Sequence, residues 1–241
     1  MTAAITIIGL GPGRLADLTL QARSLFAQAA DDDQVVYFRT SIHPTVEPLK
    51  AELPSLRLES FDRLYDASDN WETLYQQIAE ELCLLAGQQP VIYAVPGHPL
   101  IGETSVQRVL SLARERGLST EIVAGLSFLE PVCSALALDP LASGLQIVDA
   151  TALASLGADE IAGTIIPTSP LLVAQVYNRR LASAVKLALG ELYPDEWSVR
   201  LVRVAGDDGV ETVVDLPLYE LDRSNLANHL STLYVPPVSY T

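Results

Sequence analysis

The sequence predicts an α/β fold made of two α/β domains. Short β-branched apolar runs alternate with helix-like segments in the first half, a pattern typical of a largely parallel sheet. After residue 195, strand-like runs follow one another with only short turn signals between them, which favours antiparallel pairing. The 241 residues also exceed one average domain. We therefore expect an N-terminal domain over residues 1–124 with a mostly parallel sheet and a C-terminal domain over 125–241 with a mixed sheet.

The first half contains the clearer alternation of strands and helices. Thr19 stands where a helix N-cap belongs, and Gly117 where a helix C-terminal glycine belongs. Apolar residues between Trp71 and Leu85 recur with the 3.6-residue period of a helix that has one buried face. Strands are expected at residues 4–10, 34–38, 56–61, 90–95 and 119–125, and helices at 20–30, 71–85 and 104–117.

The second half begins with a change of pattern around residues 120–130. Ser127 and Glu130 form an S-x-x-E capping box, so we expect a helix from Phe128, with Pro131 tolerated near its first turn. Further along, strand-like runs occupy residues 145–150, 171–177, 198–206, 210–221 and 229–237, and a helix is expected over 179–194.

Composition narrows the classes of partner. The chain carries 30 acidic and 15 basic residues, and its net charge of −15 argues against nucleic acid and anionic membrane surfaces. No signal-peptide pattern and no membrane-length apolar run occurs, so we expect a cytoplasmic protein. Cys83 and Cys133 lack CxxC spacing and are expected to be reduced core residues. Most of the basic residues are arginines, which leaves open a local patch for a carboxylated ligand.

The first expected strand closes on a glycine-rich loop, Gly9-Leu10-Gly11-Pro12-Gly13. Glycines let the backbone turn sharply and come close to another group. A dinucleotide fingerprint would need glycine at position 14, which is Arg14, and an acidic residue after the second strand, where Arg39 stands. A nicotinamide-dependent oxidoreductase is therefore disfavoured, while a purely structural tight turn stays open.

A second loop, Pro96-Gly97-His98-Pro99, follows another expected strand. The two prolines donate no backbone hydrogen bond and fix φ, so the strand must stop and the loop becomes rigid. Such a loop suits a pocket wall that binds a ligand through its main chain. His98 is either a loop histidine satisfied by a neighbour or a catalytic base. The three histidines have no metal-ligand spacing, so no metal site is expected.

Taken in order, these segments resemble the tetrapyrrole methylase family, and most closely its branch found as the N-terminal domain of MazG-associated proteins. The resemblance covers residues 4–237. It rests on "ITIIGLGPGRLADLTLQA", "VVYFRTSIHP", "VIYAVPGHPLIGETSVQ", "EIVAGLSFLEPV", "LLVAQVYNRRLASAVKLAL", "YPDEWSVRLVRVAG", "LPLYELDR" and "HLSTLYVPP". It implies the class III methyltransferase fold, two α/β domains with a cleft that binds S-adenosylmethionine, and transfer of its methyl group to a small-molecule acceptor.

The resemblance also implies which residues bind the cofactor. Family members usually have an acidic residue where this chain has His98, and a glycine where it has Pro96. His98 and Tyr177 are the candidates for a catalytic base. The cofactor-binding residues expected by resemblance are Gly11, Pro12, Gly13, Pro96, Gly97, His98, Ile101, Ser127, Phe128, Tyr177, Ala205 and Gly206.

Two statements about partners follow from the resemblance. It implies a homodimer, and a MazG-type nucleotide pyrophosphohydrolase as a further domain or partner, although the E-x-x-E-E run of such a domain does not occur in this chain. The alternative function is a non-catalytic module that binds S-adenosylmethionine and regulates such a hydrolase.

Overall fold

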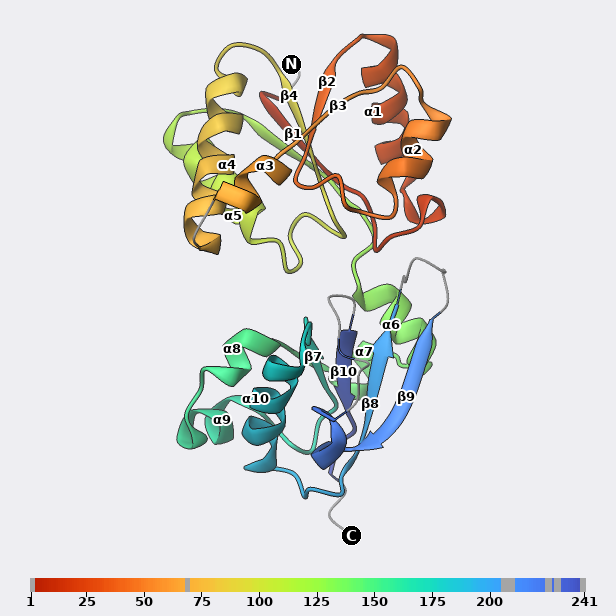
Figure 1. Cartoon of the computed structure of the whole chain (residues 1–241), viewed down its shortest axis with the longest axis vertical. Helices are drawn as coiled ribbons and strands as arrows, with labels where there is room; N and C mark the ends of the chain where they lie inside the picture. Colours follow the sequence, from red (N-terminus) through yellow and green to blue (C-terminus); the bar gives the residue numbers. More distant parts are fainter. Residues whose placement is uncertain (1–2, 68–69, 205–210, 224–226, 228–230, 239–241) are drawn as a thin grey trace. The chain divides into compact units, whose positions relative to one another are not determined.

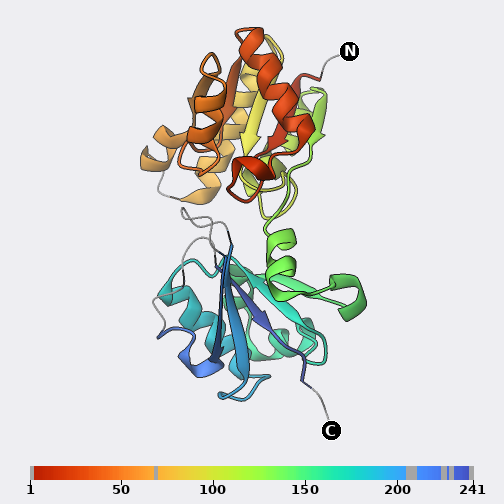
Figure 2. The same cartoon turned by 90° about the vertical axis from the view of Figure 1, so that its right-hand side faces the viewer.

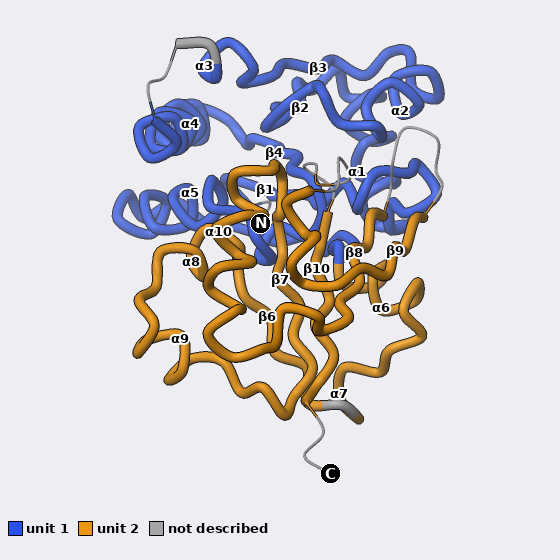
Figure 3. The backbone as a smooth tube through the Cα atoms, turned by 60° about the horizontal axis from the view of Figure 1, so that its bottom comes forward, with its two compact units in different colours: residues 1–128 blue, residues 129–241 orange. Residues whose placement is uncertain are grey.

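A computed structural model describes residues 3–67, 70–204, 211–223, 227 and 231–238 of the chain (Figure 1). The chain divides into two compact units, residues 1–128 and 129–241 (Figure 3). This division falls within the stretch of residues 120–130 where the sequence pattern changes. Each unit has its own sheet and its own core, and each is described by itself.

The first unit contains a parallel sheet with the strand order β3-β2-β4-β1-β5. All of its pairings are parallel, and Ile7 of β1 lies between Tyr93 of β4 and Ile122 of β5. Strands β1 and β4, which lie side by side inside the sheet, are buried along their whole length, as expected for a sheet covered on both faces. The strands are β1 (Ile5–Gly9), β2 (Val35–Phe38), β3 (Arg57–Ser60), β4 (Val91–Val95) and β5 (Thr120–Val123), which confirms the five expected runs.

Helices cover both faces of this sheet (Figures 1 and 2). Ile8 and Phe26 belong to the core beneath α1 and α2, whereas Ile7 and Ile78 belong to the core beneath α4 and α5. Successive strand residues thus point to opposite faces, and each face receives an amphipathic helix pair. The helical elements are η1 (Leu15–Asp17), α1 (Leu20–Asp31), α2 (Val46–Glu52), α3 (Asp62–Ala67), α4 (Trp71–Ala86) and α5 (Thr104–Glu115).

Local signals set several of these boundaries. The Thr19 hydroxyl accepts the Ala22 N–H at 3.2 Å, which confirms Thr19 as the N-cap of α1. Gly117 has φ +66°, the left-handed conformation expected after the end of α5. Helices α2 and α3 are not predicted from the sequence, because they span only 7 and 6 residues and show too few turns for a helical period.

The second unit contains a mixed sheet with the order β6-β7-β10-β8-β9. β6 and β7 pair in parallel, and the other pairs are antiparallel, as the sequence predicts. Strand β7 ends three residues before the predicted end because Gln175 adopts φ +64°, which an extended strand does not accommodate. The strands are β6 (Gln146–Asp149), β7 (Leu171–Ala174), β8 (Ser198–Arg203), β9 (Thr212–Pro217) and β10 (Ser231–Val235).

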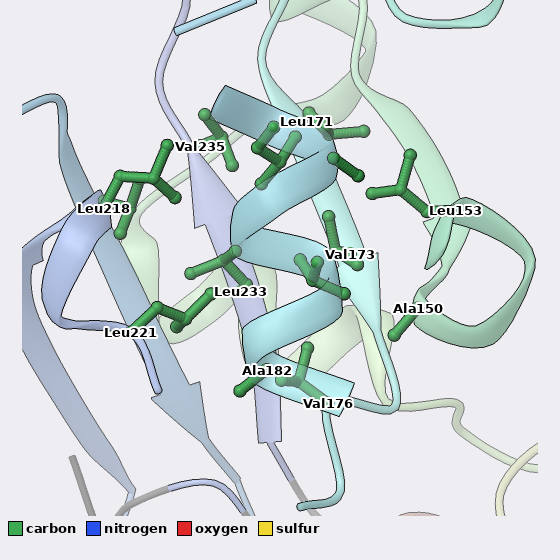
Figure 4. Close-up of a cluster of buried hydrophobic side chains, with 14 of the residues drawn as sticks. Ala150, Leu153, Leu171, Val173, Val176, Ala182, Leu218, Leu221, Leu233 and Val235 are labelled. Carbon is green, nitrogen blue, oxygen red and sulfur yellow. The ribbon is translucent and has the colours of Figure 1, made fainter. Parts of the chain in front are cut away.

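Helix α10 packs on one face of this sheet (Figure 4). Ala182 of α10 lies in one core with Val173 and Leu233 of the strands and with Leu153 of α8. The first helix of the unit begins at Leu129, one residue after the expected start, and Pro131 lies in its first turn. The helical elements are α6 (Leu129–Leu136), α7 (Pro140–Ser143), α8 (Ala150–Ala154), α9 (Ala158–Thr164), α10 (Arg179–Gly190) and η2 (Leu218–Glu220).

Two further findings concern the composition-based expectations. Both cysteines are free thiols, and Cys83 is buried in the core as expected, whereas Cys133 is only half-buried, so its expected place in the core is wrong. In the part of the chain that the structure describes, no helix combines the length and the apolar character needed to cross a bilayer.

Candidate functional site

The loops after β1 and β4 are joined by main-chain hydrogen bonds. The Gly97 N–H donates to the Gly11 carbonyl at 2.8 Å, and the Gly11 N–H donates to the Gly97 carbonyl at 3.2 Å. The Leu10 N–H also donates to the Val95 carbonyl at 2.8 Å. The glycine-rich loop and the proline-bracketed loop therefore form one structure at the carboxyl edge of the parallel sheet, where α/β proteins commonly bind ligands.

The segment after β5 joins the same structure through a second glycine contact. A Cβ on Gly9 would lie 2.5 Å from the Gly97 carbonyl oxygen and 2.7 Å from the Gly125 nitrogen. Both are backbone atoms in a packed interior, so moving either of them would cost considerable free energy. The sequence analysis did not single out Gly125. The signal that could have found it is a glycine at or just after the carboxyl end of each of the strands β1, β4 and β5.

Gly97 is constrained by its conformation. Its φ is +63°, a region that favours glycine, but a Cβ there would meet no described atom within 4 Å. The space beside Gly97 is thus open in the described protein. The close backbone approach within the described protein is made by Gly9 and Gly125.

His98 is held by its own loop. Its Nδ1 accepts the Leu100 N–H at 3.0 Å, and its carbonyl accepts the Ile101 N–H at 3.1 Å. In the neutral ring the proton must then sit on Nε2, because Nδ1 is an acceptor in this contact. This geometry favours the interpretation of His98 as a loop histidine satisfied by a neighbour, with Nε2–H left as a donor.

The other expected site residues of the first unit lie on the same segments. Ser127 is buried and Phe128 half-buried, two and three residues after Gly125. The Thr19 hydroxyl donates to the Ala124 carbonyl at 3.2 Å, which ties the start of α1 to this segment. The structure therefore groups Gly11, Pro12, Gly13, Pro96, Gly97, His98, Ile101, Ser127 and Phe128 on three neighbouring strand-end segments.

The remaining expected site residues belong to the second unit. Tyr177 follows β7 and is 42% exposed, and Asn178 after it caps α10 by accepting the Leu181 N–H at 2.9 Å. Arg179 and Arg180 are exposed at the start of α10. Ala205 and Gly206 lie outside the described residues.

A buried polar cluster that the sequence analysis missed lies at the ends of β2 and β4. Arg39 follows β2 directly, and its N–H donates to the Ala94 carbonyl at 2.9 Å. Its Nε lies 3.4 Å from Oε2 of Glu103, a carboxylate whose side chain is only 4% exposed. Oε1 of Glu103 accepts the Ser105 hydroxyl at 2.7 Å, and this hydroxyl lies 2.8 Å from the Tyr93 hydroxyl. A charged residue between a strand and a helix, here Glu103, was the available sequence signal.

Burial sets the protonation of the groups around Arg39. It raises the pKa of Tyr93 well above its usual value and that of Tyr65 to about 12. Burial, together with the positive charge of Arg39, lowers the pKa of His43 to about 4. At neutral pH the phenols of Tyr93 and Tyr65 and the imidazole of His43 are therefore neutral.

The depressed pKa of His43 makes stability depend on pH. Between its usual pKa of 6.5 and about 4, the unfolded chain binds a proton at His43 that the folded chain does not. The free energy of unfolding should therefore fall as the pH is lowered through this window. Urea unfolding from pH 7 to pH 4 should show a shallower decline in His43→Gln than in the wild type, and identical slopes would contradict this account.

A hollow elsewhere in the first unit is separate from these loops. Its volume is about 270 Å³, and it lies beside β3 and α4, lined by Tyr37, Glu59, Ser60, Phe61, Arg63, Glu81, Leu84 and Leu85. None of these residues belongs to the strand-end segments described above. Within the described ranges, no group of three or more His, Cys, Asp or Glu side chains is placed to hold a metal ion.

Comparison with known proteins places this arrangement in a family. Residues 4–222 match the family described as Tetrapyrrole (Corrin/Porphyrin) Methylases. The chain is 37% identical over 238 residues to the uncharacterized protein YabN of Bacillus subtilis (strain 168), which covers 99% of this chain and 46% of YabN. The chain thus spans about half the length of this relative.

Solved structures share the fold. A diphthine synthase superposes with a TM-score of 0.70 at 16% identity, covering 98% of this chain and 91% of its own. The uroporphyrin-III-C-methyltransferase of Thermus thermophilus has a TM-score of 0.68 at 20% identity, with 98% and 93% covered. The chain belongs to the tetrapyrrole methylase family, whose members are S-adenosylmethionine-dependent methyltransferases.

Proposed function

We propose that this protein transfers a methyl group from S-adenosylmethionine to a small-molecule acceptor. The observation that carries the proposal is the close backbone packing of three strand-end segments at Gly9, Gly97 and Gly125, at one edge of a parallel sheet. The open space beside Gly97 leaves room for a ligand, because no described atom lies within 4 Å of a Cβ at this position. The family supplies the cofactor class.

Methyl transfer from a sulfonium needs few catalytic side chains. S-adenosylmethionine, when bound, supplies a methyl group already activated by the positive sulfonium. The protein then has to hold donor and acceptor in line and exclude water, so no catalytic triad is needed. The rigid loop of Pro96 and Pro99, held to the first loop by paired hydrogen bonds, provides such positioning.

Two side chains are candidates for handling a proton of the acceptor. His98 presents Nε2, which carries a proton in the neutral ring, so it suits a donor better than a base. Tyr177, exposed after β7, is the other candidate base. The occupied Nδ1 of His98 is also the observation that favours the second function, a non-catalytic S-adenosylmethionine-binding or regulatory module associated with a MazG-type pyrophosphohydrolase.

Binding and labelling experiments separate the two functions. Isothermal titration should show binding of S-adenosylmethionine and S-adenosylhomocysteine, and no binding of either at millimolar concentration would overturn both functions. Transfer of label from a methyl-labelled donor to an acceptor supports the enzyme. Cofactor binding without transfer to any acceptor tried, tetrapyrroles included, supports the module. We also propose a homodimer, which a monomer mass by light scattering at micromolar concentration would overturn.

The variant Gly97→Val tests the loop. A β-branched side chain is strained at φ +63° and would occupy the open side of the loop. We expect cofactor binding to weaken by about 2 kcal/mol, roughly thirtyfold in Kd, measured by isothermal titration. Gly163→Ala in α9 is the control, because its Cβ meets no described atom. An unchanged Kd in Gly97→Val would remove this loop from the site.

A further inference from the structure

The loop between β4 and α5 is closed at its base by two cross-links. Arg39 forms the first, because its N–H donates to the Ala94 carbonyl at 2.9 Å and its Nε lies 3.4 Å from Oε2 of Glu103. Ala94 belongs to β4, and Glu103 directly precedes α5. Tyr93 of β4 and Ser105 of α5 form the second, with 2.8 Å between their hydroxyl oxygens. The two ends of the loop are thus bound to each other, once through Arg39 and once directly.

Glu103 takes part in both cross-links. Its Oε1 accepts the Ser105 hydroxyl at 2.7 Å, so the Ser105 proton is used there and the Tyr93 hydroxyl donates to the Ser105 oxygen. Burial raises the pKa of Tyr93 well above its usual value, which keeps this proton on the phenol at neutral pH. The hydrogen bonds of the second cross-link therefore end on the same carboxylate that faces Arg39 in the first.

The Glu103 side chain does not cap helix α5. Glu103 stands at the N-cap, where a polar side chain commonly accepts an N–H of the first turn, but it makes no hydrogen bond of this kind to the described helix. The side chain is instead turned inward and is only 4% exposed. A buried ion pair is often no more stabilising than apolar residues of similar volume, and in some proteins it serves to fix one conformation.

The loop closed in this way carries four of the residues expected to bind the cofactor. Near its start, Gly97 exchanges two main-chain hydrogen bonds with Gly11. In its middle, His98 accepts the Leu100 N–H on Nδ1 at 3.0 Å and the Ile101 N–H on its carbonyl at 3.1 Å. The start of the loop is therefore fixed by the first strand-end loop, and its end by the buried carboxylate.

We propose that Glu103 is a positioning residue that keeps residues 96–102 in the conformation that binds S-adenosylmethionine. The part in cofactor binding rests on the proposed function. Glu103 acts through the loop and not by touching the ligand, since its carboxylate is buried against Arg39 and Ser105. When only a fraction of the protein has the binding conformation, the apparent Kd rises in inverse proportion to that fraction. Loss of the carboxylate should thus weaken binding without removing a ligand contact.

Isothermal titration with S-adenosylhomocysteine tests this role. In Glu103→Gln we expect the Kd to rise at least about fivefold, because the amide keeps the hydrogen bond from Ser105 but loses the attraction to Arg39. Leu82→Ala is the matched control, because Leu82 is fully buried in α4 and its truncation destabilises the same unit outside the loop. Its Kd should equal the wild-type value where all variants are folded. A Kd of Glu103→Gln equal to that of Leu82→Ala would overturn the proposal.

The ring nitrogens of His98 report on the loop itself. With Nδ1 accepting the Leu100 N–H, the neutral ring carries its proton on Nε2. At about pH 8.5, where an ordinary imidazole is neutral, ¹⁵N spectra of the wild type should show this one tautomer, assigned by its loss in His98→Gln. In Glu103→Gln the two ring signals should move toward each other as the other tautomer becomes populated, whereas Leu82→Ala should keep the wild-type positions. Unmoved signals in Glu103→Gln would contradict the fixing of the loop.

A second pair of variants decides the matter if Glu103→Gln does not fold. Ser105→Ala removes a hydroxyl from which Glu103 accepts, so the Kd should rise and the His98 signals should move. Tyr93→Phe leaves both contacts of Glu103 in place and should keep the wild-type Kd and spectrum. Wild-type behaviour of Ser105→Ala in both measurements would refute the proposal.

The outcomes separate this proposal from the proposed function. If the wild type binds S-adenosylhomocysteine and the Glu103 and Ser105 variants bind it equally well, the cofactor site stands and the positioning role fails. If the wild type does not bind it, the proposed function fails and the part of Glu103 in cofactor binding fails with it. The His98 spectra then still decide whether Glu103 fixes the conformation of the loop.

Discussion

Gly9→Ala is expected to destabilise the protein by about 3 kcal/mol and to weaken S-adenosylmethionine binding at least tenfold. The added Cβ would lie 2.5 Å from the Gly97 carbonyl oxygen and 2.7 Å from the Gly125 nitrogen. Relief of this clash requires the strand-end segments to separate, which breaks the paired hydrogen bonds between Gly11 and Gly97. Urea unfolding measures the first effect, and isothermal titration the second.

Gly190→Ala provides the matched control. Gly190 is the last residue of α10, and a Cβ there would meet no described atom within 4 Å. This variant should keep its stability or gain about 0.5 kcal/mol, because alanine has less freedom than glycine in the unfolded chain. If Gly9→Ala behaved like Gly190→Ala in both measurements, the close approach of the three segments would be wrong.

Glu103→Gln is the second substitution with a large expected effect. The amide can still accept from Ser105, but the negative charge beside Arg39 is lost. Removing one partner of a buried ion pair is strongly destabilising because the other charge stays buried. We expect a loss of about 2 kcal/mol in urea unfolding, less than for a fully buried pair, because the Arg39 side chain is 23% exposed.

A double-mutant cycle shows whether this effect comes from the pair. The coupling energy between Arg39→Gln and Glu103→Gln should be about 1 kcal/mol or more, because each single variant leaves the other charge unpaired. The exposed pair of Arg57 and Asp33, at 3.3 Å, is the control, and Asp33→Asn should change stability by less than about 0.5 kcal/mol. A coupling energy near zero between Arg39 and Glu103 would contradict the pairing.

Much of the fold follows from local sequence patterns. The run "AITIIGL" predicts β1 because β-branched residues suit a strand buried on both faces, and Thr19 predicts the start of α1 through its hydroxyl. Short helices cannot be recognised from such patterns. Helix α2 carries Pro48 in its first turn and spans 7 residues, so its helical period is too brief to recognise.

The site was predictable only in part. The order of the loops "GLGPG", "PGHP" and "GLSF" predicts segments at the carboxyl edge of one sheet, and the structure joins these three through main-chain contacts. The close contacts at Gly9 and Gly125 were not predictable, because the neighbours of a Cβ are set by segments distant in the sequence. The assignment of individual residues to the cofactor stays a prediction.

By itself, the sequence determined the strands and the longer helices, the parallel and mixed character of the two sheets, and the resemblance to tetrapyrrole methylases. These depend on residues close together in the chain, through side-chain periodicity, capping and turn chemistry. Only the tertiary structure brought Gly9 against Gly97 and Gly125, and Arg39 against Glu103. Contacts between residues distant in sequence depend on strand order and helix packing, which local patterns do not encode.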